Sequence, residues 1–234
     1  MYKRPLLFFS YTLVIIFASS FLTALYFQHY VMASPAAESL SFISPEKIEQ
    51  SPLQDDNAIV EVFSYACHYC EVNESGVAEL EKRLPAGAKL VRLHLSDDDH
   101  AGMAAFAPLF ATLTVMGIEA QHRPAAYRAI IKENLNLADE KQLSAWLVVN
   151  GIDEAAYQRT RDSERVKELL AYMTAVSRYY QVNATPSFIV NRKWLALQDR
   201  EFSAFSQQLL SLLQHDKPLA PDAPARGSGL SGLA

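Results

Sequence analysis

The sequence predicts an α/β fold in which an all-helical segment interrupts a small β-sheet. Two short β-rich runs with a helical stretch between them come first, and nearly continuous helical periodicity follows from about residue 97 to 181. Two further short strands and a last helix then close the pattern. This order corresponds to a βαβ unit and a ββα unit separated by a helical insertion.

The first ordered elements belong to the βαβ unit. Ala58–Phe63 is a short run rich in β-branched residues, as a strand requires. Glu71–Arg83 has helical periodicity, and Pro85 with Gly87 directly follows its end. Lys89–Leu95 alternates apolar and polar residues, which predicts the second strand.

The helical block and the closing ββα unit are predicted from periodicity and turn residues. Gly117 and the pair Asn150-Gly151 mark turns inside the block, and Ser163 is suited to cap a helix. The expected helices of the block are 102–116, 124–133, 140–149, 154–161 and 163–180. The expected closing elements are strands 187–191 and 194–197 and a helix over 200–213.

The N-terminus predicts export from the cytoplasm. Lys3 and Arg4 precede an uncharged stretch, Leu6–Phe27, whose length suits the ~20 residues of a membrane-spanning helix. Positive charge before the stretch places the following residues outside the cytoplasm, on the periplasmic face of a bacterial inner membrane. The small residues Val31 and Ala33 leave a cleaved signal and a soluble periplasmic protein as the alternative.

Composition separates the remaining segments. Residues 29–54 are rich in Ser, Ala, Pro and Glu, which predicts a tether, and the Pro, Gly, Ser and Ala of 217–234 predict a disordered tail. The expected organisation is an anchor or signal over 1–28, the tether, an α/β domain of 55–96 and 182–216, a helical insertion over 97–181, and the tail.

Charge and cysteine content narrow the function. The net charge is −5 and no basic stripe is present, so a nucleic-acid partner is not expected. The chain has only 2 cysteines, and they are two residues apart. A disulfide-stapled scaffold would distribute its cysteines along the chain. This pair is therefore expected to serve chemistry or metal binding.

The motif Cys67-His68-Tyr69-Cys70 follows a predicted strand and opens a predicted helix. Unpaired backbone N–H groups and the helix dipole at that position stabilise an anion on Cys67. The Cys67 thiolate is then available both as nucleophile and as leaving group. Cys70, one helical turn later, is expected on the inner side, close enough to form a disulfide.

Two other interpretations of the cysteine pair remain open. A structural zinc site needs two more ligands, and the available histidines lack a metal-binding spacing (His68, His94, His100 and His122). An inert structural disulfide would gain little stability, because the loop that it closes is short. Neither a metal nor an organic cofactor is expected.

Two segments resemble one family closely. Ile59–Cys70 resembles the active-site strand and turn of DsbA-type thiol:disulfide oxidoreductases, which are thioredoxin folds with an inserted helical domain. Ala184–Asn191 is similar to the cis-proline segment of that fold. The resemblance extends over about residues 59–215, including the length of the insertion. It implies a thioredoxin-like fold and a redox-active disulfide.

The resemblance also implies roles for the cysteines and the proline segment. Cys67 would be the exposed redox cysteine and Cys70 the buried resolving one. Pro186 would follow a cis peptide bond opposite Cys67, and Thr185 would pair with substrate backbone. By sequence alone, a trans proline would be the ordinary expectation.

Charged residues of the family correspond to three positions here. Glu61, six positions before the first cysteine, would lie beneath the disulfide and assist proton transfer. Arg92 falls where the family often has a basic partner on the neighbouring strand. Glu74, in the first part of the helix, would modulate the site or cap the helix. A solvated strand position is the alternative for Glu61.

The chain departs from the family between its cysteines. Oxidising members typically have Pro-His there, whereas this chain has His68-Tyr69, so the contact of His68 with Cys67 is open. Thr185 resembles isomerase-type members, where strong oxidases commonly have valine. These two differences leave the redox poise open and keep the chemical class.

The sequence therefore predicts a monomeric protein thiol:disulfide oxidoreductase that forms disulfides in exported proteins with free thiols. The resemblance implies a membrane partner, a quinone-linked oxidase, that regenerates the disulfide. One alternative is a membrane-tethered reductase or isomerase supplied by an electron donor. The other is a non-catalytic periplasmic assembly or chaperone module that binds through the helical insertion.

Overall fold

The computed structural model describes residues 3–26 and 39–219, in two compact units, Met1–Ser39 and Leu40–Ala234. In the first unit, Lys3–Tyr26 form helix α1. Within these described ranges, no helix combines the length and the apolar character that crossing a membrane requires. The membrane span expected over Leu6–Phe27 is therefore not supported, and Phe27 itself lies outside the described residues.

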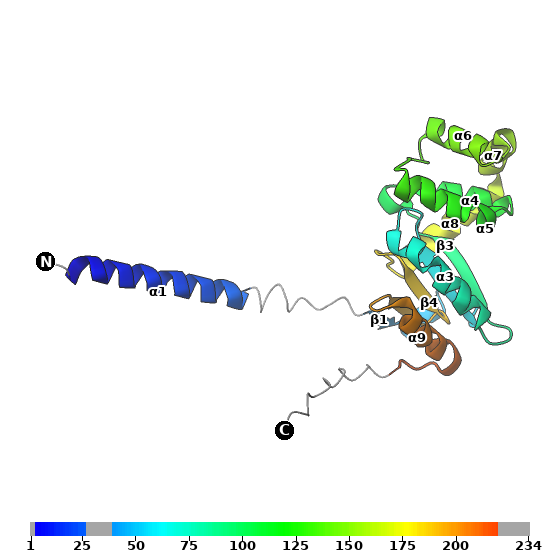
Figure 1. Cartoon of the computed structure of the whole chain (residues 1–234). Coiled ribbons are helices and arrows are strands. Elements are labelled where there is room, and N and C mark those ends of the chain that lie inside the picture. The colour runs from blue at the N-terminus through cyan, green and yellow to red at the C-terminus, as the bar shows by residue number, and fades with distance from the viewer. Residues whose placement is uncertain (1–2, 27–38, 220–234) are drawn as a thin grey trace, which may run out of the picture. The chain divides into compact units, whose positions relative to one another are not determined.

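The second unit is built on a five-stranded sheet (Figure 1). The strand order is β1-β5-β4-β2-β3. Strand β2 pairs in parallel with β3 and antiparallel with β4. Strand β5 lies antiparallel between β4 and β1. All six residues of β2 are buried, and this strand lies inside the sheet between β4 and β3. The strands are β1 Leu40–Phe42, β2 Ala58–Phe63, β3 Lys89–His94, β4 Ser187–Val190 and β5 Trp194–Leu197.

Strand β1 corrects the tether expected over 29–54. Residues from Leu40 onward belong to the domain, because β1 pairs with β5 and the Phe42 ring packs 4.8 Å from that of Trp194. A short helix, α2 (Pro45–Ile48), follows. Ser51 is buried, and its hydroxyl lies 2.6 Å from that of Tyr180. A strand of three residues is too short for alternation to reveal it in the sequence.

Two helices pack together against the sheet. Helix α3 (His68–Lys82) and helix α9 (Phe202–His215) share a hydrophobic cluster with the sheet. Gly76 permits their close approach, because a Cβ atom there would lie only 2.4 Å from the Phe202 ring. The first turn of α3 is thereby held at the end of β2, where the cysteines lie.

The helical insertion lies between β3 and β4 and groups beyond the sheet (Figure 1). Its core is continuous with that of the sheet, since Phe63 of β2 packs edge-on against Phe110 and near Tyr127. The insertion contains a 3₁₀ helix (Gly102–Phe106), α4 (Ala107–Val115), α5 (Glu119–Tyr127), a π-helical turn (Arg128–Lys132), α6 (Glu140–Val149), α7 (Glu154–Arg161) and α8 (Glu164–Tyr179).

Two insertion helices differ from their expected bounds. The expected helix 102–116 is 3₁₀ up to Phe106 and becomes α-helical where Pro108 occupies its first turn, a position that suits proline. The helix expected from Pro124 begins at Glu119, so Pro124 lies inside α5 and does not start it. A π-helical turn then continues the helix.

Gly76→Ala is expected to destabilise the protein by about 1–2 kcal/mol, although alanine favours helices over glycine. The added methyl group would overlap the buried ring of Phe202. Urea unfolding measures the change, and Ser75→Ala on the exposed side of α3 is the matched control. An unchanged or increased unfolding free energy for Gly76→Ala would show that the helices separate at little cost.

Candidate functional site

The two cysteines form a disulfide at the junction of β2 and α3. Their Cα atoms lie 5.2 Å apart. Cys67 is the N-cap residue of α3, and its Sγ accepts a hydrogen bond from the Cys70 backbone N–H at 3.1 Å. Cys67 is 4% exposed and Cys70 is completely buried. Any partner must therefore reach the Cys67 sulfur, at the positive end of the helix.

The Thr185–Pro186 peptide bond is cis and lies opposite the disulfide. The backbone oxygen of Thr185 is 3.3 Å from the Cys67 Sγ. This contact explains why Cys67 is less exposed than its expected role suggests. The Thr185 hydroxyl also lies 3.9 Å from the sulfur of Met103, which belongs to the helical insertion. Thr185 thus contacts two segments that are distant in the sequence, the turn that carries Cys67 and the start of the insertion.

The two residues between the cysteines face outward. Tyr69 is 69% exposed, and the His68 side chain is directed toward Glu71, with Nδ1 3.4 Å from a carboxylate oxygen. Lys132 of the insertion lies 2.9 Å from the same oxygen. The Cys67 sulfur contacts the Cys70 N–H and Thr185 instead. His68 therefore adds a titratable group to the rim of the site.

Glu61 and Arg92 lie side by side on the parallel strands β2 and β3. The Glu61 side chain is completely buried, and Arg92 Nε is 3.3 Å from its Oε2. Burial, the largest effect, raises the pKa of Glu61 to about 7 against the opposing charge of Arg92. In the described part of the chain neither Glu61 oxygen has a hydrogen bond, so the contact with Arg92 is ionic without hydrogen-bond alignment.

The charges continue from Arg92 into the insertion. Arg92 Nη1 donates to Glu74 Oε1 at 2.6 Å, and Arg123 Nη1 donates to the other Glu74 oxygen at 3.4 Å. Arg123 also donates through Nε and Nη2 to both oxygens of Glu119. We call these five residues, Glu61, Arg92, Glu74, Arg123 and Glu119, the carboxylate–arginine cluster.

Sequence reasoning identified Glu61, Glu74 and Arg92 but missed Glu119 and Arg123. Glu119 and Arg123 are four residues apart, a spacing that brings side chains together on one helix face. That signal is common on solvated helices, and the sequence does not reveal that this face turns toward α3. The expected contact of Arg92 with Glu61 is present.

Tyr65 and His94 hold the turn that leads to Cys67. The Tyr65 hydroxyl donates to Glu119 at 2.8 Å, and its backbone N–H donates to His94 Nε2 at 3.1 Å. His94 Nδ1 in turn lies 2.7 Å from the backbone oxygen of Leu95. Burial lowers the pKa of His94 to about 4. The ring is thus neutral, with the proton on Nδ1, and acts as a structural residue.

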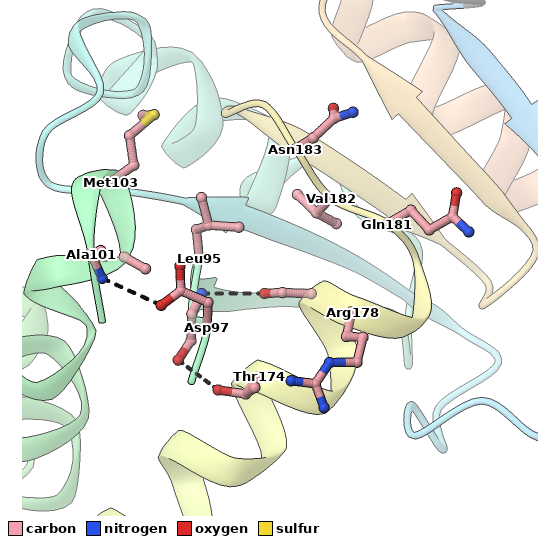
Figure 2. A pocket seen from close by; sticks show the side chains of 12 residues that line it. Leu95, Asp97, Ala101, Met103, Thr174, Arg178, Gln181, Val182 and Asn183 are labelled. Atoms are coloured by element: carbon pink, nitrogen blue, oxygen red, sulfur yellow. Dashed lines mark hydrogen bonds between the residues drawn. The ribbon is translucent and has the colours of Figure 1, made fainter. Parts of the chain in front are cut away.

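A cavity of about 560 Å³ opens beside Met103, close to Thr185 (Figure 2). Leu95, Met103 and Val182 give it an apolar lining, and Asp97 and Arg178 stand at its polar side. The Asp97 carboxylate accepts from the Ala101 N–H. The cavity lies next to the segment that faces the disulfide, so it adjoins the position of any polypeptide bound there. Across the described residues, no group of three or more His, Cys, Asp or Glu is arranged to hold a metal ion.

Residues 77–210 match the family model described as DSBA-like thioredoxin domain. This range includes the insertion, the Thr185–Pro186 bond and the first part of α9, and it begins after the cysteine pair. The match covers more than half of the chain.

Curated relatives carry the name thiol:disulfide interchange protein DsbA. The Pseudomonas syringae protein is 28% identical over 136 residues, which are 58% of this chain and 63% of that protein. The Bordetella pertussis protein is 26% identical over 168 residues, 72% of this chain and 73% of that protein. The chain thus spans less than two thirds of the length of the first relative.

Solved structures show the same fold. A variant of Pseudomonas aeruginosa DsbA aligns with a TM-score of 0.64 and 25% identity, over 70% of this chain and 90% of that one. DsbA from Klebsiella pneumoniae aligns with a TM-score of 0.59 and 21% identity, over 74% of this chain and 92% of that one.

His94→Gln is expected to weaken the loss of stability in acid. The folded pKa of about 4 lies below the usual 6.5, so unfolding takes up a proton between those values and stability falls as pH decreases. The contribution is at most about 1.4 kcal/mol per pH unit. Gln keeps an acceptor for the Tyr65 N–H without titrating. Urea unfolding of both proteins from pH 7 to 4 measures the difference, and parallel curves would contradict the assignment.

Proposed function

Because the chain belongs to the DsbA-like thioredoxin domain family, we propose that it exchanges disulfides with exported polypeptides through Cys67 and Cys70. One observation carries the proposal: the Cys67–Cys70 disulfide lies at a helix N-terminus with Cys67 as N-cap, and Cys67 is the less buried of the two residues. A thiolate left at this position is stabilised by backbone N–H groups and the helix dipole. The chain is thus suited to protein thiol:disulfide oxidoreductase activity.

In the disulfide-forming direction, a client thiolate attacks the Cys67 sulfur. The Cys67–Cys70 bond breaks, Cys70 leaves as a thiolate, and a mixed disulfide joins the client to Cys67. A second client thiolate then attacks the client sulfur of that mixed disulfide and expels Cys67 as a thiolate. The client loses two electrons, and the cysteine pair gains them. No metal or organic cofactor takes part in these steps.

Glu61 supplies the proton that the Cys70 thiolate needs. Cys70 and Glu74 lie one turn apart on the same face of α3, and Arg92 contacts both Glu74 and Glu61. These contacts support a position of Glu61 near the buried side of the cysteine pair. With a pKa raised to about 7 by burial, Glu61 holds a proton for part of the time near neutral pH. A group of that pKa suits general acid and base catalysis.

Client polypeptides bind across the Thr185–Pro186 segment. The Thr185 backbone oxygen lies 3.3 Å from the reactive sulfur, so a client strand paired there brings its cysteine to Cys67. The cavity beside Met103 then receives a neighbouring client side chain. His68 and the exposed Tyr69 form the other rim. The preferred clients are therefore extended chains with a free thiol.

The apolar N-terminal segment and the disulfide favour the periplasm as the compartment of this reaction. An oxidising partner, such as a quinone-linked membrane oxidase, must remove the two electrons that each cycle leaves on the cysteine pair. We propose that the protein meets clients and this partner as a monomer through the same Cys67 sulfur.

Cys70→Ser is expected to accumulate mixed disulfides between Cys67 and client proteins, because the resolving thiol is absent. Non-reducing gels of cells that produce the variant should show high-mass adducts that reductant removes. Cys67→Ser is the control and should form few adducts. Stronger trapping by Cys67→Ser would reverse the roles of the cysteines, and full biological function of the double cysteine variant would indicate a binding module.

Glu61→Gln is expected to slow disulfide transfer to a client peptide by about 100-fold or more at pH 6, since general acid catalysis is lost. The ratio of wild-type to variant rate should fall as pH increases through about 7. The substitution should also increase the free energy of unfolding near neutral pH. Because the pKa of Glu61 is raised in the folded state, wild type loses stability relative to the Gln variant as pH increases from 4.5 to 7. Stopped-flow rates and urea unfolding measure both. A ratio independent of pH would remove Glu61 from proton transfer.

A further inference from the structure

The carboxylate–arginine cluster contains three carboxyl groups and two guanidinium groups. Two arginines cannot neutralise three ionised carboxylates, and a buried uncompensated charge is costly. Glu119 and Glu74 accept hydrogen bonds from the arginines, whereas Glu61 accepts none in the described residues. Glu61 is therefore the member that holds a proton most readily. How strongly it does so depends on how the two arginines are shared.

We propose that Arg123 is a positioning residue, which neutralises Glu119 and shares Glu74, so that Arg92 keeps its Nε side turned toward Glu61. The proposal rests on the function given above to Glu61. It assigns to the helical insertion a part in the proton chemistry of the cysteine pair, because Arg123 and Glu119 both belong to α5.

The contacts of Glu74 support this sharing. One oxygen of Glu74 accepts from Arg92 at 2.6 Å and the other from Arg123 at 3.4 Å. Without Arg123, the Glu74 carboxylate would draw more of the Arg92 charge to itself. Arg92 would then neutralise Glu61 less well than across the present 3.3 Å. Removing Arg123 thus destabilises the ionised form of Glu61 in two ways. It removes a positive charge, and it draws Arg92 away from Glu61 toward Glu74.

The position of Arg123 is fixed by hydrogen bonds to Glu119, which is itself held by Tyr65. Both of its bonds to Glu119 are on the mostly buried face of α5, where Glu119 is 7% exposed. Glu119 also accepts from the Tyr65 hydroxyl, and the Tyr65 backbone is held by His94. The guanidinium of Arg123 is therefore anchored to the turn that carries Cys67.

The electrostatic signs around Glu61 follow from the elements packed on it. Burial is the largest effect and raises its pKa, Arg92 of β3 and Arg123 of α5 lower it, and Glu74 of α3 and Glu119 of α5 raise it. Tyr127 of α5 also faces this group and remains neutral, because burial raises its own pKa well above the usual range. The Cys67–Cys70 disulfide carries no charge until it is reduced.

Two substitutions that replace a charged residue by glutamine should therefore shift the pKa of Glu61 in opposite directions. Arg123→Gln removes a positive charge, so Glu61 should keep its proton to a pH about one unit higher. Glu119→Gln removes a negative charge and retains one acceptor oxygen, for Tyr65 and Arg123 Nε, so Glu61 should lose its proton about one unit lower. Shifts of this size are expected for unit charges at an effective dielectric of about 20.

The test is a ¹³C NMR titration of glutamate carboxyl groups in the full oxidised chain. The Glu61→Gln variant identifies the Glu61 resonance by its disappearance. Arg123→Lys should stay close to wild type because it keeps the charge. Arg161→Gln is the matched control, since Arg161 pairs with Glu140 at a distance from the cluster and should leave Glu61 unchanged.

The proposal would be overturned if the pKa of Glu61 shifted in the same direction in Arg123→Gln and Glu119→Gln, or if it shifted in neither. A purely structural role of these two residues does not predict shifts of opposite direction. Arg123→Gln leaves Glu119 buried without its partner, and if that variant does not fold, Glu119→Gln alone decides by the sign of its shift. Trapping by Cys70→Ser is measured separately. Opposite shifts without trapping would contradict the proposed function and leave the role of Arg123 intact.

Discussion

A carboxyl group completely buried on an interior strand of the sheet is the constraint on which the site depends. Glu61 lies on β2, whose six residues are all buried. An isolated charge at such a position would cost too much free energy to be kept. Arg92 on the adjacent strand supplies one partner at 3.3 Å. Arg92 also forms an ion pair with Glu74 on α3, and Glu74 forms a second ion pair with Arg123 of the insertion. One buried group thereby ties the sheet, the first helix and the helical insertion to a common centre.

The sulfur chemistry uses the same junction of elements. Strand β2 delivers Cys67 to the N-terminus of α3, the Thr185 segment covers its sulfur, and Gly76 lets α3 settle against α9. Polar groups near the cysteines respond to pH in opposite ways. Burial keeps His94 neutral and makes acid unfavourable, whereas burial of Glu61 makes ionisation unfavourable as pH increases. Between pH 4.5 and 6.5 the two effects on the free energy of unfolding therefore oppose each other.

Local sequence predicted most elements because their signals are local. The bounds of β2, β5, α6 and α7 agree with those expected from periodicity and turn residues. Strand β1 was missed because three residues show no period, and its pairing with β5 is a long-range contact. Helix α5 begins before Pro124 because tertiary packing overrides the preference of proline for a first turn. The membrane span drawn from the uncharged N-terminal stretch is not supported.

The sequence by itself determined the order of the elements, the cysteine motif at a helix start, and the resemblance that singled out Pro186, Glu61 and Arg92. The element order and the cysteine motif depend on residues that are neighbours along the chain, and the resemblance depends on short sequence motifs. Only the tertiary structure decided that His68 turns toward Glu71 and that Glu119 and Arg123 complete the cluster. An ion pair four residues apart looks the same on a solvated helix and on a buried one. Its effect on Glu61 comes from burial and distance, which exist only after the chain has folded.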